Sequence, residues 1–391
     1  MSNVFHKTYD AVIAGGGIAG ISAALAAGRS GLKTALIEKQ NLLGGLATAG
    51  LISIYFPLCD GNGHQVTYGI AEELLLASLK YSPFDLSSPW NGRKEETVGK
   101  SRYMCQFSPA ALILAADEML EEAGVDIWLD TLITDAEVNE EKRVTSVTAE
   151  NVSGKIIFHA ENFLDATGDG SLIRHADGKL IYGNNRPSFW FIEKYDKVSS
   201  FDFCGNIKLT SLPEEVRNTS SSFSYNGRTV TEFSRNNWKK LREYYQKSYT
   251  EKKEDRHSRF PMILPAMPQF RTIAKITGRK SISYENVNTY MDSSVGLCAD
   301  WRYPGKVFET PYEALLPSDL KGVITAGRII SCDAKAWEVF RVIPAAAMTG
   351  EVAGTAIVLA QKNKLDVENV PVKELQEKLA EKGFIFHIRD L

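Results

Sequence analysis

The chain has 391 residues, of which 44% are hydrophobic and 24% are charged. These fractions are ordinary for a globular protein and exclude the disordered, collagen-like and coiled-coil classes. Its 45 Lys and Arg residues against 48 Asp and Glu give a net charge of −3, which argues against a nucleic-acid partner or a strongly anionic membrane surface.

The cysteines and the N-terminal residues indicate a reducing compartment. The five cysteines are widely spaced with no CxxC pair, and the six histidines are scattered with no HExxH. Neither a disulfide framework nor a metal site is therefore expected. No signal-peptide core precedes the first strand and no apolar stretch reaches membrane length, so we expect a cytoplasmic protein without a membrane partner.

The first predicted elements along the chain are a strand, a glycine-rich turn, a helix and a second strand. The apolar run 10–14 is bounded by glycine, which predicts a buried strand of a parallel sheet. Residues 15–20 (GGGIAG) form the turn, and the Ala-rich segment 21–30 predicts a helix that Gly31 ends. The apolar run 33–38 predicts the second strand, which ends in an acid.

The middle of the chain predicts two helices followed by a meander. One helix is expected at 69–80, and Ser108 with Pro109 starts another that runs to residue 122. Short alternating segments then predict antiparallel strands inserted in, or laid over, the parallel sheet, at 125–129, 136–138, 144–150 and 155–159.

The composition also divides the chain into domains. Buried-strand character returns at 162–166 and 323–326, whereas aromatic residues, Ser, Thr and Asn increase over 181–304. We therefore expect an α/β cofactor domain built from 1–180 and 305–391, and a second, mixed α+β substrate or cap domain over 181–304.

The turn after the first strand fits the dinucleotide-binding pattern GxGxxG. Gly15 allows a tight turn, Gly17 lets a pyrophosphate approach the backbone, and Gly20 lets the helix pack close to the strand. The phosphates would then lie on the amides at the start of the helix near Ile18. Glu38, at the end of the second strand, is placed to accept both ribose hydroxyls. These residues predict a dinucleotide and leave NAD and FAD equally open.

The first fifty residues resemble the FAD-dependent oxidoreductases of the glutathione-reductase-like class, and more narrowly a bacterial group related to fumarate reductase flavoproteins. Three later segments resemble the same group in order and spacing. They are the GGLAT loop 44–48, the LDATGDG segment 164–170, and Gly327-Arg328 followed by RVIP at 341–344 and an Ala-rich helix over 343–361.

The resemblance implies FAD as the cofactor and a Rossmann-like FAD-binding domain, in which the antiparallel meander is inserted in the parallel sheet. The start of the helix near Ile343 would place backbone amides and a positive dipole end beside the flavin. The residues expected to contact the cofactor are Gly15, Gly16, Gly17, Ile18, Ala19, Gly20, Glu38, Lys39, Gly44, Gly45, Leu46, Thr48, Ile133, Ala166, Thr167, Gly168, Asp169, Gly327, Arg328, Ile343 and Ala345.

Four residues are candidates for the chemical step. Arg271 could clamp a substrate carboxylate, although Ala274 stands where the resembling group would carry a second basic residue. Arg341 could contact substrate or balance charge on the flavin, and Tyr55 and His64 follow the GGLAT loop, where His64 could act as an acid or base. The alternatives are structural: ion pairs for the arginines, and core or surface positions for the other two.

The leading hypothesis is an FAD-dependent oxidoreductase that transfers a hydride between flavin N5 and a small organic substrate. The chain has no second GxGxxG and no paired-cysteine motif, so electrons would come from or go to a small substrate, a transiently bound nicotinamide, oxygen or a separate redox protein. Two alternatives stay open: an NAD-binding enzyme similar to thiazole synthases, and a flavin-fold protein whose cofactor is structural.

Overall fold

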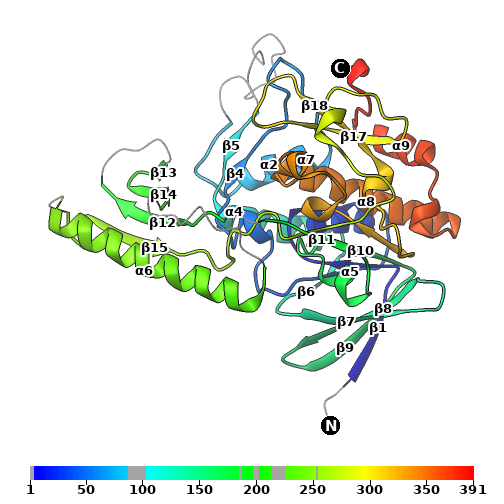
Figure 1. Cartoon of the computed structure of the whole chain (residues 1–391), viewed down its shortest axis with the longest axis horizontal. Coiled ribbons are helices and arrows are strands. Elements are labelled where there is room, and N and C mark those ends of the chain that lie inside the picture. Colours follow the sequence, from blue (N-terminus) through cyan, green and yellow to red (C-terminus); the bar gives the residue numbers. More distant parts are fainter. Residues whose placement is uncertain (1–3, 87–102, 185–186, 197–201, 213–224, 252–253) are drawn as a thin grey trace.

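The centre of the molecule is a five-stranded parallel sheet in the order β19, β10, β2, β3, β6 (Figure 1). The computed structural model describes residues 4–86, 103–184, 187–196, 202–212, 225–251 and 254–391. The strands of the sheet are β2 (Ala11–Ala14), β3 (Thr34–Ile37), β6 (Asp126–Trp128), β10 (Asn162–Asp165) and β19 (Val323–Thr325). All except β6 are buried along their length, because layers cover both faces of the sheet.

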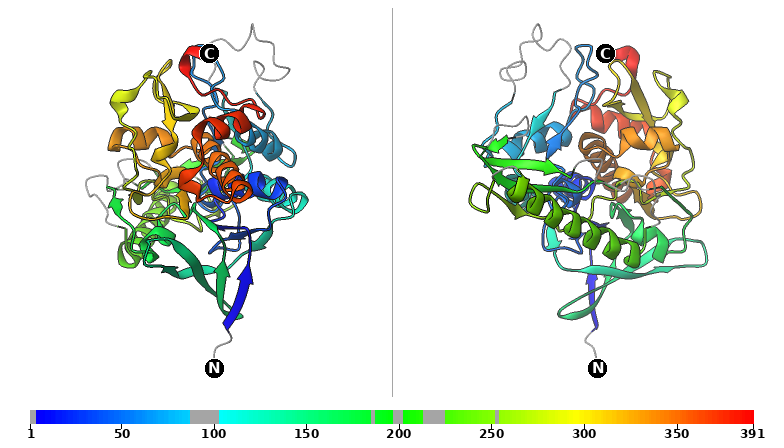
Figure 2. Two further views of the ribbon diagram at one scale, coloured as in Figure 1. Left: turned by 90° about the vertical axis from the view of Figure 1, so that its right-hand side faces the viewer. Right: turned by 60° about the vertical axis from the view of Figure 1, so that its left-hand side comes forward.

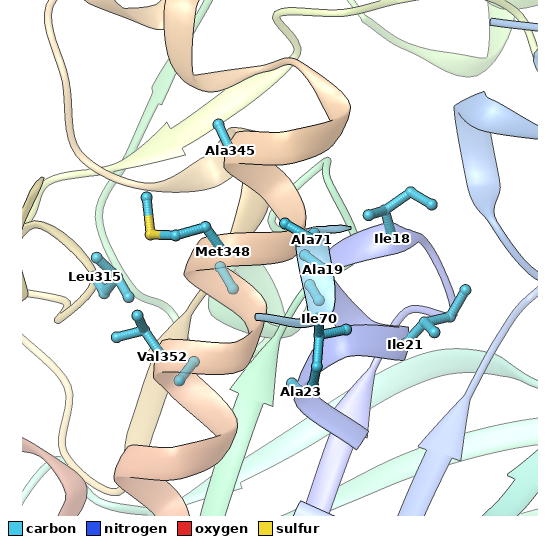
Figure 3. Packing of buried hydrophobic residues seen from close by; sticks show 14 of the residues in the cluster. Ile18, Ala19, Ile21, Ala23, Ile70, Ala71, Leu315, Ala345, Met348 and Val352 are labelled. Carbon is cyan, nitrogen blue, oxygen red and sulfur yellow. The ribbon is translucent and has the colours of Figure 1, made fainter. Parts of the chain in front are cut away.

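Helices cover one face of this sheet. They are α1 (Ile18–Arg29), α2 (Ile70–Leu79), α4 (Pro109–Glu122) and α8 (Ile343–Asn363). Ala11 and Ile13 of β2 belong to the core that α1 and α8 share. Figure 3 shows α1 beside α8, with the small side chains of Ala19 and Ala23 on α1. Within the described ranges α8 is the one helix long and apolar enough to cross a membrane, and 83% of its most apolar window is buried inside the protein.

A second sheet covers the other face. It contains β1 (Val4–Thr8), β7 (Leu132–Val138), β8 (Val144–Asn151) and β9 (Gly154–His159), in the order β1, β9, β8, β7. The alternate residues of β2, Val12 and Ala14, face this meander. The predicted meander is present, but its expected first strand is not part of it: β6 joins the parallel sheet beside β3, with Ile37 opposite Trp128.

A lobe projects from this body (Figures 1 and 2). Its sheet has the order β13 (Asp202–Cys204), β14 (Ile207–Ser211), β12 (Trp190–Tyr195), β15 (Arg259–Ile263), and the long helix α6 (Gly227–Glu251) packs on it. Phe191 of the sheet and Phe233 and Tyr245 of α6 share one apolar cluster. The lobe joins the body through β11 (Leu180–Tyr182), which pairs with β16 (Ala274–Ile276).

The remaining elements complete the body. The hairpin of β17 (Ser294–Ala299) and β18 (Val307–Pro311) runs across the predicted domain boundary at 304 and packs against α8. The other short elements are β4 (Ile54–Tyr55), β5 (Cys105–Gln106), α5 (Ser171–His175), α7 (Ala334–Phe340) and α9 (Val372–Ala380). The α/β class with a parallel sheet and antiparallel additions is confirmed.

Candidate functional site

The glycine turn between β2 and α1 leaves no room for a side chain at two of its glycines. A Cβ on Gly20 would lie 1.8 Å from the carbonyl oxygen of Gly15, and one on Gly15 would lie 2.7 Å from the carbonyl oxygen of Ala166. A Cβ on Gly17 would meet nothing within 4 Å. Two glycines of the turn are therefore required by packing inside the protein, whereas the third borders open space.

That open space is a cavity of about 460 Å³ at the carboxyl end of the parallel sheet. Gly15, Gly17, Ile18 and Ala19 line it, so the first turn of α1 presents its free amides and its positive dipole end to the cavity. A crevice outside the carboxyl ends of parallel strands is where open α/β sheets bind ligands.

Glu38 ends β3 and lies beside the turn. Its carboxylate accepts hydrogen bonds from the backbone N–H of Gly16 at 2.7 Å and of Gln40 at 2.9 Å. The side chain lines the cavity although it is 5% exposed, and this burial raises its pKa. The carboxylate is therefore held in one position at the strand end, with oxygen lone pairs left to accept from a ligand.

An ion pair crosses the carboxyl end of β2. Lys39 follows β3, Asp169 follows β10, and these two strands flank β2, so the 3.0 Å contact between Lys39 Nζ and Asp169 Oδ2 spans the glycine turn. Burial opposes ionisation of Asp169, but Lys39, the Ser171 hydroxyl and Arg328 outweigh it and lower its pKa to about 2. Arg328 also donates to the carbonyl of Gly168 at 2.7 Å.

The glycine-rich loop after β3 closes over the same place. Gly44 donates its N–H to the carbonyl of Gly16 at 2.8 Å, and a short 3-10 turn follows at Gly45–Ala47. Gly44, Gly45 and Leu46 line the cavity. Thr48 does not, because its hydroxyl turns back to the carbonyl of Leu43.

A second helix N-terminus points at the cavity. α8 begins at Ile343 with Pro344 in its first turn, and Val342, Ile343 and Ala346 line the cavity. A Cβ on Gly350 would lie 2.2 Å from the carbonyl oxygen of Ala19, so α8 and α1 pack closely enough to bring both N-termini to one space. Two dipole ends then favour negative charge in it.

The far wall of the cavity is aromatic and basic. Trp190, Met267 and Arg271 come from the lobe and its connection, and Phe56, Trp301 and Arg341 come from the body. Arg271 lies over the Trp190 ring, with 5.5 Å from guanidinium carbon to ring centre. Arg341 forms an ion pair with Glu338, to which its Nε donates at 2.9 Å.

The structure gathers most of the predicted cofactor residues at this cavity. Those that line it are Gly15, Gly17, Ile18, Ala19, Glu38, Lys39, Gly44, Gly45, Leu46, Ile133, Ala166, Thr167, Gly168, Gly327, Arg328 and Ile343. Those that lie just outside the lining are Gly16, Gly20, Thr48, Asp169 and Ala345. Of these five, Gly16, Thr48 and Asp169 contact lining residues directly, and a Cβ on Gly20 would collide with the lining residue Gly15.

The candidates for the chemical step separate into two pairs. Arg271 and Arg341 line the cavity. Tyr55 and His64 are not in its lining. Tyr55 is fully buried, its hydroxyl donates to the carbonyl of Ala71, and burial raises its pKa well above the ordinary value. His64 is half exposed and contacts Asp60 through Nδ1 at 3.0 Å.

Sequence reasoning missed the apolar wall. Its members are Ile52, Ile54, Phe56, Met104, Trp190, Met267 and Trp301. The available signal is strand alternation: β4 places Tyr55 in the core, so its neighbours Ile54 and Phe56 point to the opposite side, toward the cavity.

The cavity suits a dinucleotide that carries a flat ring system. One end offers free amides, a strand-end carboxylate and open space at Gly17, and the other offers apolar and aromatic side chains. Groups for the phosphates, a ribose and an apolar ring therefore occur in one continuous space.

Comparison with known proteins identifies one matching family model and several solved structures of similar fold. The model of a family described as FAD dependent oxidoreductase matches residues 10–297 and 288–379. No curated protein sequence matches the chain.

A geranylgeranyl bacteriochlorophyll reductase-like protein from Thermoplasma acidophilum is similar in structure, with 15% identity and a TM-score of 0.52 over 97% of this chain and 84% of that protein. A p-nitrophenol 4-monooxygenase from Pseudomonas putida is 12% identical, with a TM-score of 0.47 over 96% of this chain and 83% of that one. The first of these structures shows a shared fold.

Proposed function

The chain belongs to the FAD-dependent oxidoreductase family, and from that premise we propose that it transfers a hydride between flavin N5 and a small organic substrate. It is an enzyme, and its cofactor is FAD. The NAD-binding alternative is thereby set aside. The proposal concerns which residues hold the cofactor and what happens at the aromatic end of the cavity.

The glycine turn and Glu38 hold the nucleotide half in this proposal. The free amides of Gly17 and Ile18 donate to the pyrophosphate, and Glu38 accepts from the ribose hydroxyls. Lys39 and Arg328 line the same end and add positive charge near the phosphates. Gly17 supports this assignment most directly, because open space faces it where the other turn glycines meet protein.

The start of α8 faces the flavin half. The free amide of Ile343 and the positive dipole end of the helix favour negative charge on the ring, and Arg341 lies just before this helix start. FAD supplies N5, which accepts or releases a hydride. Phe56, Trp301 and Trp190 exclude water from the place where the substrate carbon must approach.

The reaction balances in either direction. In oxidation, a C–H bond next to an alcohol or amine breaks, its electron pair leaves with the hydrogen as hydride, and the heteroatom proton passes to water. None of the described lining side chains at the aromatic end is a carboxylate or histidine that could take this proton. In reduction, an activated double bond gains the hydride and then a proton from water. A separate acceptor or donor, of which oxygen is the simplest acceptor, completes the cycle.

The observation that carries the proposal is the single cavity that runs from the glycine turn to the aromatic wall. The test is anaerobic mixing of the FAD-loaded protein with a panel of alcohols and amines, followed by the visible flavin bands. We expect one substrate class to bleach the bands, and we expect deuterium at the reacting carbon to slow the bleaching several-fold. The reverse arm starts with dithionite-reduced protein and follows recovery of the bands on adding activated alkenes. Protein that dithionite bleaches, but that no alcohol or amine reduces with an isotope effect and no activated alkene reoxidises, would contradict the proposal.

A further inference from the structure

We infer that His6 and His159 form a binding site for a divalent transition-metal ion on the outer face of the sheet of β1, β7, β8 and β9. Neither residue lines the cavity, so the inference goes beyond the proposed function and does not depend on it. The ion belongs to the class that imidazole nitrogen prefers, which includes Zn²⁺, Ni²⁺ and Cu²⁺. The site binds the ion without a change in its oxidation state.

The two imidazole rings meet across neighbouring strands. His6 is the central residue of β1, and His159 is the last residue of β9, which pairs with β1 in parallel. His6 Nδ1 lies 3.0 Å from His159 Nε2, whereas the ring centres are 5.4 Å apart and the ring planes differ by 7°. The rings therefore approach one another nitrogen to nitrogen.

The spacing of these nitrogens suits two ligands of one ion. A ligating imidazole nitrogen lies about 2.0–2.1 Å from such an ion, so two of them are about 2.9 Å apart at a right angle and about 3.3 Å apart at the tetrahedral angle. The observed 3.0 Å lies within this interval. Neither side chain is buried, so rotation of the two rings can turn both lone pairs toward one ion while the strands stay in place.

The backbone of the sheet fixes the positions of the pair. The strands β1 and β9 pair along the whole of β1, from Val4 opposite Lys155 to Thr8 opposite His159. The strand β9 is paired in turn with β8 on its other side. Because the two ligands are brought together before the ion arrives, little conformational freedom is lost on binding.

The same face of the sheet supplies negative charge near the pair. Ser146 of β8 lies directly opposite His159, and Glu137 of β7 lies directly opposite Ser146. Residues opposite one another on paired strands share a face, and the Ser146 hydroxyl donates to the Glu137 carboxylate at 2.8 Å. Within the described part of the chain, no group of three or more His, Cys, Asp or Glu side chains is placed to hold a metal ion. The site therefore has two protein ligands, and water fills the other positions on the ion.

A bound ion would fasten β1 to the rest of the sheet. The strand β1 is at the edge of its sheet, all of its residues are exposed, and Figure 2 shows it at the end of the molecule that carries the N-terminus. Within this sheet β1 is paired with β9 alone. One ligand on each strand would link the two, so that β1 could separate from β9 only after the ion had left.

The test is a calorimetric titration of tag-free, FAD-loaded protein with Ni²⁺. We expect one ion per chain, and we expect His6→Gln and His159→Gln each to weaken binding at least about tenfold, because each leaves a single imidazole in place of two linked ligands. His257→Gln is the matched control, since His257 is an exposed histidine just before β15, and it should leave the affinity unchanged.

Two further measurements report on the ligands themselves. Electron paramagnetic resonance of the Cu²⁺-loaded protein should show two nitrogen ligands in the parent and one in either variant. Ni²⁺ should slow hydrogen exchange of the β1 amides in the parent and leave it unchanged in both variants. His6→Gln carries the test if His159→Gln lowers stability, because the His6 side chain is exposed on an edge strand.

Three outcomes would overturn the inference: no binding of Ni²⁺ at millimolar concentration, parental affinity in a folded His6→Gln protein, or a Cu²⁺ spectrum with a single nitrogen ligand in the parent. The proposed function fails separately. Flavin content and hydride transfer should be the same in the parent and both variants, so loss of the metal site leaves the hydride proposal standing. Failure of every substrate to transfer hydride would likewise leave the metal site standing.

Discussion

A Gly17→Ala substitution, which adds one methyl group, can test cofactor binding separately from folding. A Cβ at this position would meet no protein atom within 4 Å, and the residue has φ −73, which alanine adopts without strain. The added methyl would instead occupy the space assigned to the pyrophosphate. We therefore expect Gly17→Ala protein to fold with an unchanged melting temperature of the apo form but to retain little or no FAD after purification.

Alanine substitutions at two other glycines serve as comparisons for the Gly17→Ala prediction. Gly20→Ala should lower stability as well as flavin content, because its Cβ would lie 1.8 Å from a backbone oxygen. Gly227→Ala at the start of α6, where a Cβ also meets nothing within 4 Å, should change neither quantity. Flavin content is measured by the visible absorbance of a protein solution of known concentration. A yellow Gly17→Ala protein with the flavin content of the parent would refute the assignment of the phosphates to this turn.

At the scale of elements, a buried carboxyl joins α8 to α2. Glu351 of α8 is 2% exposed and accepts from the backbone N–H of Ile70, the first residue of α2, at 2.6 Å. Burial raises its pKa from an ordinary value of 4.5 to about 7, and the Ile70 hydrogen bond offsets only part of that increase. The folded state therefore binds the Glu351 proton more tightly than the unfolded state.

The sign of the pH dependence follows from that difference. The contribution of Glu351 to stability is fully present below about pH 4.5 and is lost as the pH rises through about 7. Glu351→Gln keeps an acceptor for Ile70 and removes the charge. We expect its free energy of unfolding to exceed that of the parent by about 1–3 kcal/mol at about pH 8, and to match it near pH 4.5.

Urea unfolding across this pH range measures the difference. Glu377→Gln, an exposed change on α9, serves as control and should follow the parent at every pH. A Glu351→Gln protein whose stability curve runs parallel to that of the parent would show that this carboxyl titrates normally in the folded state.

The crossing of α1 and α8 depends on small residues. A Cβ on Gly350 would lie 2.2 Å from the carbonyl oxygen of Ala19, and one on Gly354 would lie 2.4 Å from that of Ala23. Gly350→Ala must separate the two helices and should cost about 1–3 kcal/mol of unfolding free energy, although alanine favours helix formation. Lys362→Ala, on an exposed position of the same helix, should stay within about 0.5 kcal/mol of the parent. Stabilisation by Gly350→Ala in urea unfolding would contradict the close crossing.

For the molecule as a whole, a buried polar contact is one of the interactions that join the lobe to the body. Gln269 has no exposed surface and donates to the carbonyl of Gly50. Gln269→Leu would leave that carbonyl without this donor, so we expect a loss of about 1–3 kcal/mol in unfolding free energy. Flavin content should be retained, because the nucleotide end of the cavity is built from the body. Thermal melts and absorbance of the same samples check both statements, and a colourless variant would show that the lobe is needed to retain FAD.

The sequence predicts the local parts of the fold and site best. The glycine turn, β2, β3 and α1 follow from short-range patterns, because the glycine spacing and the apolar runs lie within one βαβ unit. Membership of β6 in the parallel sheet is not predictable in this way, since a short strand has the same local pattern in either sheet. The aromatic wall assembles Phe56, Trp190 and Trp301 from three distant segments, and no local pattern links them. Helix α6 was missed because charged residues surround its few buried ones.

The close contact between α1 and α8 has a consequence for the order of synthesis. Residues 18–29 leave the ribosome long before their packing partner at 343–363 and the sheet strand β19. Until those later segments have been synthesised, the nascent chain carries an exposed glycine turn and an apolar helix that lacks its α8 packing partner. Because the start of α8 lines the cavity, we expect firm FAD capture only after that later segment has docked. Chains interrupted before α8 should be handled by the cell as unfolded.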